Sequence, residues 1–87
     1  MGIIVTINKV AYKNHKASGT LEVYKSDLIN GLVRQKYKLP GDELAIMRKK
    51  IAKPENDAVI AEFNEYNAYV ESCIIAVENA IIDLEFN

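Results

Sequence analysis

The feature that most constrains this chain is a heptad pattern of apolar residues through its last third. From Val59 to Leu84, apolar side chains are spaced alternately four and three residues apart. The series consists of Val59, Phe63, Tyr66, Val70, Cys73, Val77, Ala80 and Leu84. No Gly or Pro interrupts residues 57–84. The pattern predicts one helix of about 42 Å, which exceeds the roughly 30 Å diameter of a compact domain of this length.

The same helix is apolar beyond a single row. Between Cys73 and Ile82 only Glu78 and Asn79 are polar. Because a helix that is apolar on most sides must be buried on most sides, a second copy of the chain is the simplest cover for it. We therefore expect a homo-oligomer, of undetermined stoichiometry, that forms through this helix. The expected interface residues are Val59, Phe63, Tyr66, Val70, Cys73, Val77, Ile81 and Leu84.

The first 25 residues have the pattern of a β-hairpin. Ile3, Val5 and Ile7 alternate with other residues in a β-branched run, which is typical of a strand. Residues 14–19 are polar and end in Gly, as a loop does, and residues 20–25 alternate again. We therefore expect two strands in residues 1–25, covered on one face by the helices that follow.

Residues 26–53 predict two short helices separated by a turn. Ser26 or Asp27 can cap the first, and Pro40-Gly41 separates it from the second. Leu44, Met47 and Ile51 form one apolar face of the second helix. The expected fold is therefore a single helix-dominated α+β domain. It consists of a hairpin (residues 1–25), a basic helix-turn-helix-like segment (26–53) and a long acidic helix (54–87).

The charges divide at Pro54, although the net charge is only −1. Residues 1–53 hold all 11 basic residues and four acidic ones, a balance of +7. Residues 54–87 hold eight acidic residues and no basic one, a balance of −8. Our first interpretation is attraction between the two halves, within one chain or between antiparallel copies.

The alternative interpretation is a small nucleic-acid-binding regulator that uses the basic face of residues 34–53. The candidate residues are Arg34, Arg48, Lys49, Lys50 and Lys53. A DNA-reading helix contacts bases through its N-terminal residues. Asp42 and Glu43 occupy that position here and would face phosphates, so we rank this alternative second.

The sequence contains no pattern typical of catalysis or of a cofactor site. One Cys and one His cannot form an internal disulfide or a zinc site with three or four N/S ligands. Cys73 occupies a heptad core position, and His15 lies in a polar stretch without an adjacent nucleophile. We expect no enzyme activity, no metal and no cofactor. The single cysteine favours the cytoplasm, and no apolar run approaches the 18 residues of a membrane span.

Residues 42–48 read Asp-Glu-Leu-Ala-Ile-Met-Arg, and residues 65–73 read Glu-Tyr-Asn-Ala-Tyr-Val-Glu-Ser-Cys. These two segments resemble small phage- and prophage-encoded proteins of low-GC bacteria and Bacteroides relatives. The resemblance spans residues 27–73 and departs at Pro40-Gly41, where a Ser often precedes the Asp-Glu pair. It implies a phage origin, with a location in the host cytoplasm, and supplies no catalytic residues. Our leading interpretation is a non-enzymatic protein-interaction module that self-associates through its C-terminal helix, as a phage accessory or assembly protein.

Overall fold

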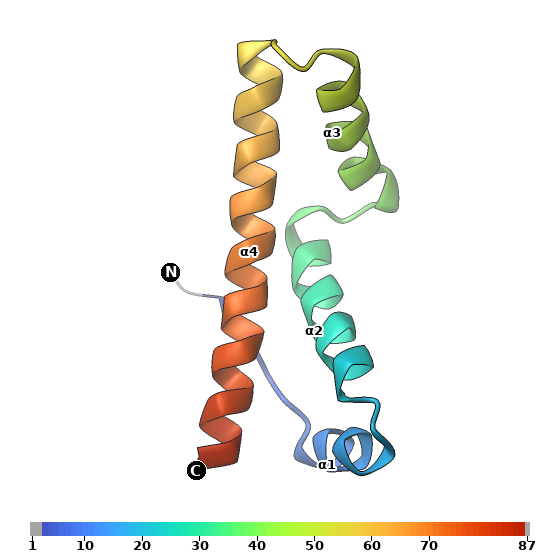
Figure 1. Ribbon diagram of the computed structural model, residues 1–87, viewed down its shortest axis with the longest axis vertical. Helices are drawn as coiled ribbons and strands as arrows, with labels where there is room; N and C mark the ends of the chain where they lie inside the picture. The colour runs from blue at the N-terminus through green and yellow to red at the C-terminus, as the bar shows by residue number, and fades with distance from the viewer. Residues whose placement is uncertain (1–2, 87) are drawn as a thin grey trace.

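The structure, a computed structural model, describes residues 3–86 and is built from α-helices. Over that range it has α1 (Lys9–Ser18), α2 (Leu21–Lys36), α3 (Pro40–Ala52) and α4 (Asp57–Phe86). Helix α4 forms one layer, against which α2 and α3 lie one after the other, while α1 lies crosswise near its C-terminal end (Figure 1). The 30 residues of α4 set the longest dimension of the molecule, 46 Å. The radius of gyration is 15.6 Å, against about 12 Å for a compact domain of this length.

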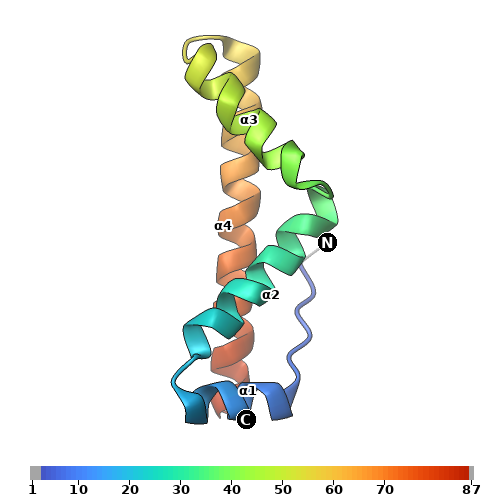
Figure 2. The same ribbon diagram turned by 90° about the vertical axis from the view of Figure 1, so that its right-hand side faces the viewer.

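The predicted β-hairpin and the α+β class are wrong, because no strand occurs between residues 3 and 86. Residues 3–8 form an extended arm beside the C-terminal half of α4 (Figure 2). The expected alternation within the arm is present, since Ile3, Val5 and Ile7 are half-buried while Ile4 and Thr6 are exposed. The rest of the predicted hairpin is α1 and the start of α2.

Two caps explain why α1 forms where a strand and a loop were expected. The Asn8 side chain accepts hydrogen bonds from the backbone N–H groups of Val10 and Ala11, at 3.0 and 3.1 Å. At the other end Gly19 adopts φ +73° and its N–H bonds back to the helix. Glycine takes this left-handed conformation without a Cβ penalty. Both capping residues can be read from the sequence, but the β-branched residues of the arm favoured the prediction of a strand.

The second predicted strand is instead the first turn of α2. Leu21, Tyr24, Leu28 and Leu32 are spaced three, four and four residues apart and face inward as one stripe. A six-residue window over residues 20–25 shows only alternation, whereas the longer window shows the helical period. The helix expected from about residue 27 therefore begins six residues earlier, at Leu21.

The main core lies around the C-terminal half of α4. Its buried cluster joins α1, α2 and α4 through Tyr12, Tyr24, Leu32, Val33, Cys73, Val77 and Ile81. Cys73 and Val77 have no exposed surface. The arm adds Ile3, Val5 and Ile7 to the edge of this cluster. The N-terminal half of α4 is covered by α3, and there the buried side chains are Ile46 and Tyr66.

Candidate interaction surface

The predicted oligomer row on α4 faces the interior of the chain itself. Tyr66, Cys73, Val77 and Ile81 are buried, and Val59, Phe63, Val70 and Leu84 are partly buried. Helices α1, α2 and α3 together with the arm cover this row, so the heptad pattern describes an intramolecular core. These side chains are largely covered by the chain itself, and the most exposed apolar side chains lie elsewhere.

Helix α3 is held on α4 by one row of side chains. Ile46 is buried, the Tyr66 hydroxyl donates a hydrogen bond to the Glu43 carboxylate at 2.6 Å, and the Lys50 ammonium lies 5.9 Å from the Phe63 ring centre. Burial of the ring and the Glu43 carboxylate raise the pKa of Tyr66 to about 12. Glu43, Ile46 and Lys50 therefore define the face of α3 that meets α4.

The apolar face of α3 predicted from the sequence is a different row, and it is exposed. Leu44, Met47 and Ile51 are 49%, 40% and 80% exposed. Each follows directly after a residue of the row that faces α4, so this exposed strip is rotated by about 100° around the helix axis. Leu39, 65% exposed, precedes the helix. We name Leu44, Met47 and Ile51 the α3 strip.

A second set of exposed apolar side chains lies on α4. Ile75 and Ile82 are about half exposed and Phe86 is 83% exposed. Glu71 and Glu78 are exposed and lie within the same part of the helix surface by their spacing. This side of α4 therefore combines apolar and acidic groups, without a basic residue anywhere in the helix.

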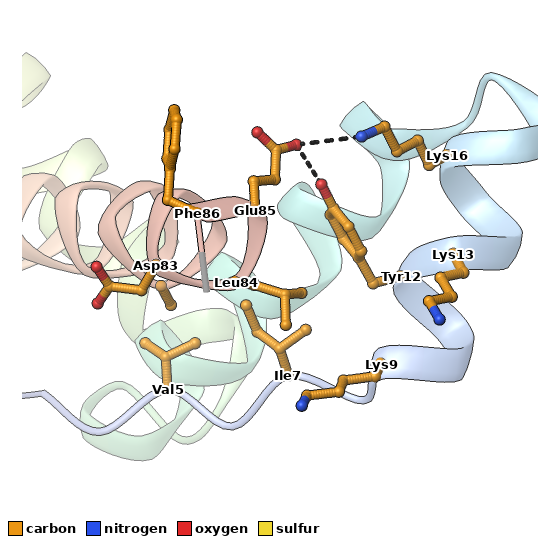
Figure 3. A pocket seen from close by; sticks show the side chains of 11 residues that line it. Val5, Ile7, Lys9, Tyr12, Lys13, Lys16, Asp83, Leu84, Glu85 and Phe86 are labelled. Carbon is orange, nitrogen blue, oxygen red and sulfur yellow. Dashed lines mark hydrogen bonds and ion pairs between the residues drawn. The ribbon is translucent and has the colours of Figure 1, made fainter.

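A cavity of about 900 Å³ lies where the arm, α1 and the end of α4 meet. Figure 3 shows that Val5, Ile7 and Leu84 line it together with the lysines of α1. A smaller cavity of about 710 Å³ lies between the arm and the middle of α4. Both cavities are lined by Val5, Ala80 and Asp83, so space remains between the arm and α4.

Three polar side chains of the larger cavity are bonded to one another. The Tyr12 hydroxyl donates to the Glu85 carboxylate, which also pairs with Lys16 at 3.6 Å (Figure 3). The hydrogen bond raises the pKa of Tyr12 and lowers the pKa of Glu85, so the phenol stays neutral and the carboxylate charged at neutral pH. Tyr12, Lys16 and Glu85 therefore connect α1 to the C-terminal end of α4, and their role is structural.

Of the basic residues proposed to bind nucleic acid, some are bonded within the chain and the others are exposed. Lys49 pairs with Glu62 of α4 at 3.4 Å, and Lys50 donates to the Pro54 carbonyl at 3.1 Å. A further lysine, Lys36, pairs with Glu65 at 3.1 Å. Arg34, Arg48 and Lys53 are exposed and form no ion pair with any residue between 3 and 86. Some basic side chains of residues 1–53 are thus neutralised by acidic side chains of α4 within the same chain.

Cys73 and His15, the remaining candidates for a reactive group, are packed against or bonded to neighbouring residues of the chain. Cys73 is fully buried, and burial raises the pKa of its thiol, which disfavours the reactive thiolate. His15 stacks on Tyr24 with ring centres 5.0 Å apart and bonds to the Thr20 hydroxyl at 2.8 Å. In the part of the chain that the structure describes, no three His, Cys, Asp or Glu side chains are grouped to hold a metal ion.

Comparisons with known proteins found no matching family model, no similar curated protein and no similar solved structure. Within residues 3–86, no helix is long and apolar enough to span a membrane. The α3 strip places three exposed apolar side chains in one row of a helix. Their spacing in the sequence identifies one apolar row but does not show that it is uncovered, because α4 packs on the adjacent row, in which only Ile46 is apolar.

Proposed function

We propose that this protein is a non-enzymatic protein-interaction module that self-associates. The observation that supports the proposal is the balance of apolar side chains between the interior and the surface. Across residues 3–86, nine side chains form the buried core, whereas ten large apolar side chains are exposed. A monomeric protein of this size has a thin stability margin, and burial of such residues against a partner is a common remedy.

The proposed interface differs from the one expected from the heptad pattern. The row from Val59 to Leu84 stabilises the single chain, so we assign self-association to apolar surface that the chain leaves uncovered. The resemblance of residues 27–73 to small phage-encoded proteins is the reason to place the module among phage accessory or assembly proteins. The same resemblance supports a location in the host cytoplasm.

Sedimentation velocity over about 5 to 200 µM protein tests the proposal, because association makes the mean mass concentration-dependent. We expect the mass to rise from that of one chain, 9.8 kDa, toward a multiple of it. A mass of 9.8 kDa over the whole range would contradict self-association.

Nucleic-acid binding by Arg34, Arg48, Lys49, Lys50 and Lys53 is the second candidate. The free side chains of Arg34, Arg48 and Lys53 support it, while the pairing of Lys49 with Glu62 places it second. Binding of this kind would weaken steeply with salt. A mobility shift with DNA or RNA at about 50 mM salt that disappears near 200 mM would favour it, and no shift at the lower salt would reject it.

A further inference from the structure

The α3 strip has the position of a contact face in a four-helix bundle. In such a bundle each helix meets two neighbours, which touch it about 90° apart. Helix α3 contacts α4 through the face that carries Glu43, Ile46 and Lys50. The strip of Leu44, Met47 and Ile51 lies about 100° away from that face. The place of a second neighbour is therefore exposed in the single chain.

The charges of α3 indicate which neighbour fits. Asp42 and Glu43 lie in its first turn, and Lys49 and Lys50 lie in its last turn, followed by Lys53. An antiparallel copy of α3 would place its basic end beside the acidic end of the first. The helix dipoles would also oppose one another favourably. A parallel copy would bring like charges together at both ends.

We propose, resting on the self-association above, that α3 pairs with α3 of a second copy in an antiparallel arrangement. The twofold axis passes between Met47 and Arg48, which sets Leu44 of each chain against Ile51 of the other. The same register sets the acidic first turn of each α3 beside the basic last turn of the other. One register thus covers the apolar strip and brings oppositely charged helix ends together, which is the self-complementarity that a twofold interface requires.

The exposed side of α4 fits a second copy less well. Its apolar residues Ile75 and Ile82 are accompanied by Glu71 and Glu78, and the helix contains no basic residue. Two such helices would bring carboxylates together across the interface, which disfavours pairing. The α3 pair has one like-charge contact, because Arg48 lies beside the axis. The Arg48→Gln variant should therefore associate at least as strongly as the wild type, whereas nucleic-acid binding would weaken.

Disulfide formation between mixed cysteine variants tests the register. In a Cys73→Ala background, Leu44→Cys and Ile51→Cys chains should cross-link with each other when mixed, because residues 44 and 51 face one another. Neither variant alone should form a disulfide dimer, since two copies of residue 44 would lie about 10 Å apart along the axis. A dimer from Leu44→Cys alone, or no dimer from the mixture, would overturn the antiparallel register.

Sedimentation of a matched pair of variants tests the surface. Met47→Lys places an ammonium group at the centre of the pair, beside Arg48 of the second copy, and should weaken association at least about tenfold. Val23→Lys, on α2 at a side chain that is 56% exposed against 40% for Met47, should leave it unchanged. If the wild type associates and Met47→Lys associates equally well, the α3 pair is wrong while self-association stands. A monomeric wild type would reject both proposals.

Discussion

The two halves of α4 are packed very differently, although they belong to one uninterrupted helix. The C-terminal half is enclosed by α1, α2 and the arm, and there Cys73 and Val77 are completely buried. The N-terminal half is covered by α3 and, at Glu65 and Tyr69, by the end of α2, and the α3 strip remains in solvent. The C-terminal half therefore provides the stability of the chain. The α3 end retains apolar surface for association.

The largest effect should come from a charge placed in the enclosed half. We expect Val77→Asp to lower the free energy of unfolding by about 4 kcal/mol, because a carboxylate there has no partner and no access to water. Ile75→Asp, two residues away and half exposed, should cost less than about 1 kcal/mol. Urea unfolding followed by circular dichroism measures both. Equal losses would show that α4 is not enclosed as described.

Two buried isoleucines compare the halves directly. Ile81 and Ile46 are 5% and 7% exposed, but Ile81 belongs to the main cluster and Ile46 does not. The cost of a cavity depends on how well its surroundings can collapse into it. We expect Ile81→Ala to cost about 4 kcal/mol and Ile46→Ala about 2 kcal/mol. Urea unfolding should give that order, and the reverse order would place the stability at the α3 end.

Alkaline pH should weaken the attachment of α3 to α4. The pKa of Tyr66 is raised from 10.0 to about 12 in the folded chain, so its neutral form is favoured there. The contribution is present below pH 10 and is lost as the pH rises toward 12, because the unfolded chain releases the proton first. Phenolate absorbance of the wild type and Tyr66→Phe should differ by one group that titrates near pH 12. A difference near pH 10 would contradict the buried contact with Glu43.

The smallest effect should come from the ion pairs between the two charged halves. Lys49 and Glu62 are about half exposed, and exposed pairs stabilise proteins by about 0.3 kcal/mol. A double-mutant cycle of Lys49→Ala and Glu62→Ala should give a coupling of that size, decreasing with salt. A coupling above about 1 kcal/mol would show that charge attraction, rather than apolar packing, holds α3 on α4.

The sequence allowed some elements to be predicted and misled on others for identifiable reasons. The helices at 40–52 and from Asp57 onward follow from the spacing of their apolar residues, and in the structure the side chains of Asp42 and Asn56 accept backbone hydrogen bonds at their N-termini, both at 3.1 Å. The hairpin failed because alternation within a few residues cannot separate an arm or a helix turn from a strand.

The interface prediction depended on a question that periodicity alone cannot answer. The heptad row from Val59 to Leu84 is real, but a row on α4 does not specify whether its cover is the same chain or another. The α3 strip presented the opposite problem. Leu44, Met47 and Ile51 have the spacing of a core face, whereas α4 packs on the adjacent row through a single isoleucine and two charged residues. Only the three-dimensional arrangement shows which row is covered.

Residue-resolved amide hydrogen exchange at two protein concentrations tests the account most directly. In the enclosed half, the amides of α2 and of residues 70–81 of α4 should exchange slowly at low and high concentration alike, because their protection arises within one chain. The amides of α3 should exchange quickly in dilute protein and slow markedly when the protein associates. If α3 is equally protected at both concentrations, or if residues 70–81 are the ones that gain protection, the assignment of stability and association to separate ends of the molecule is contradicted.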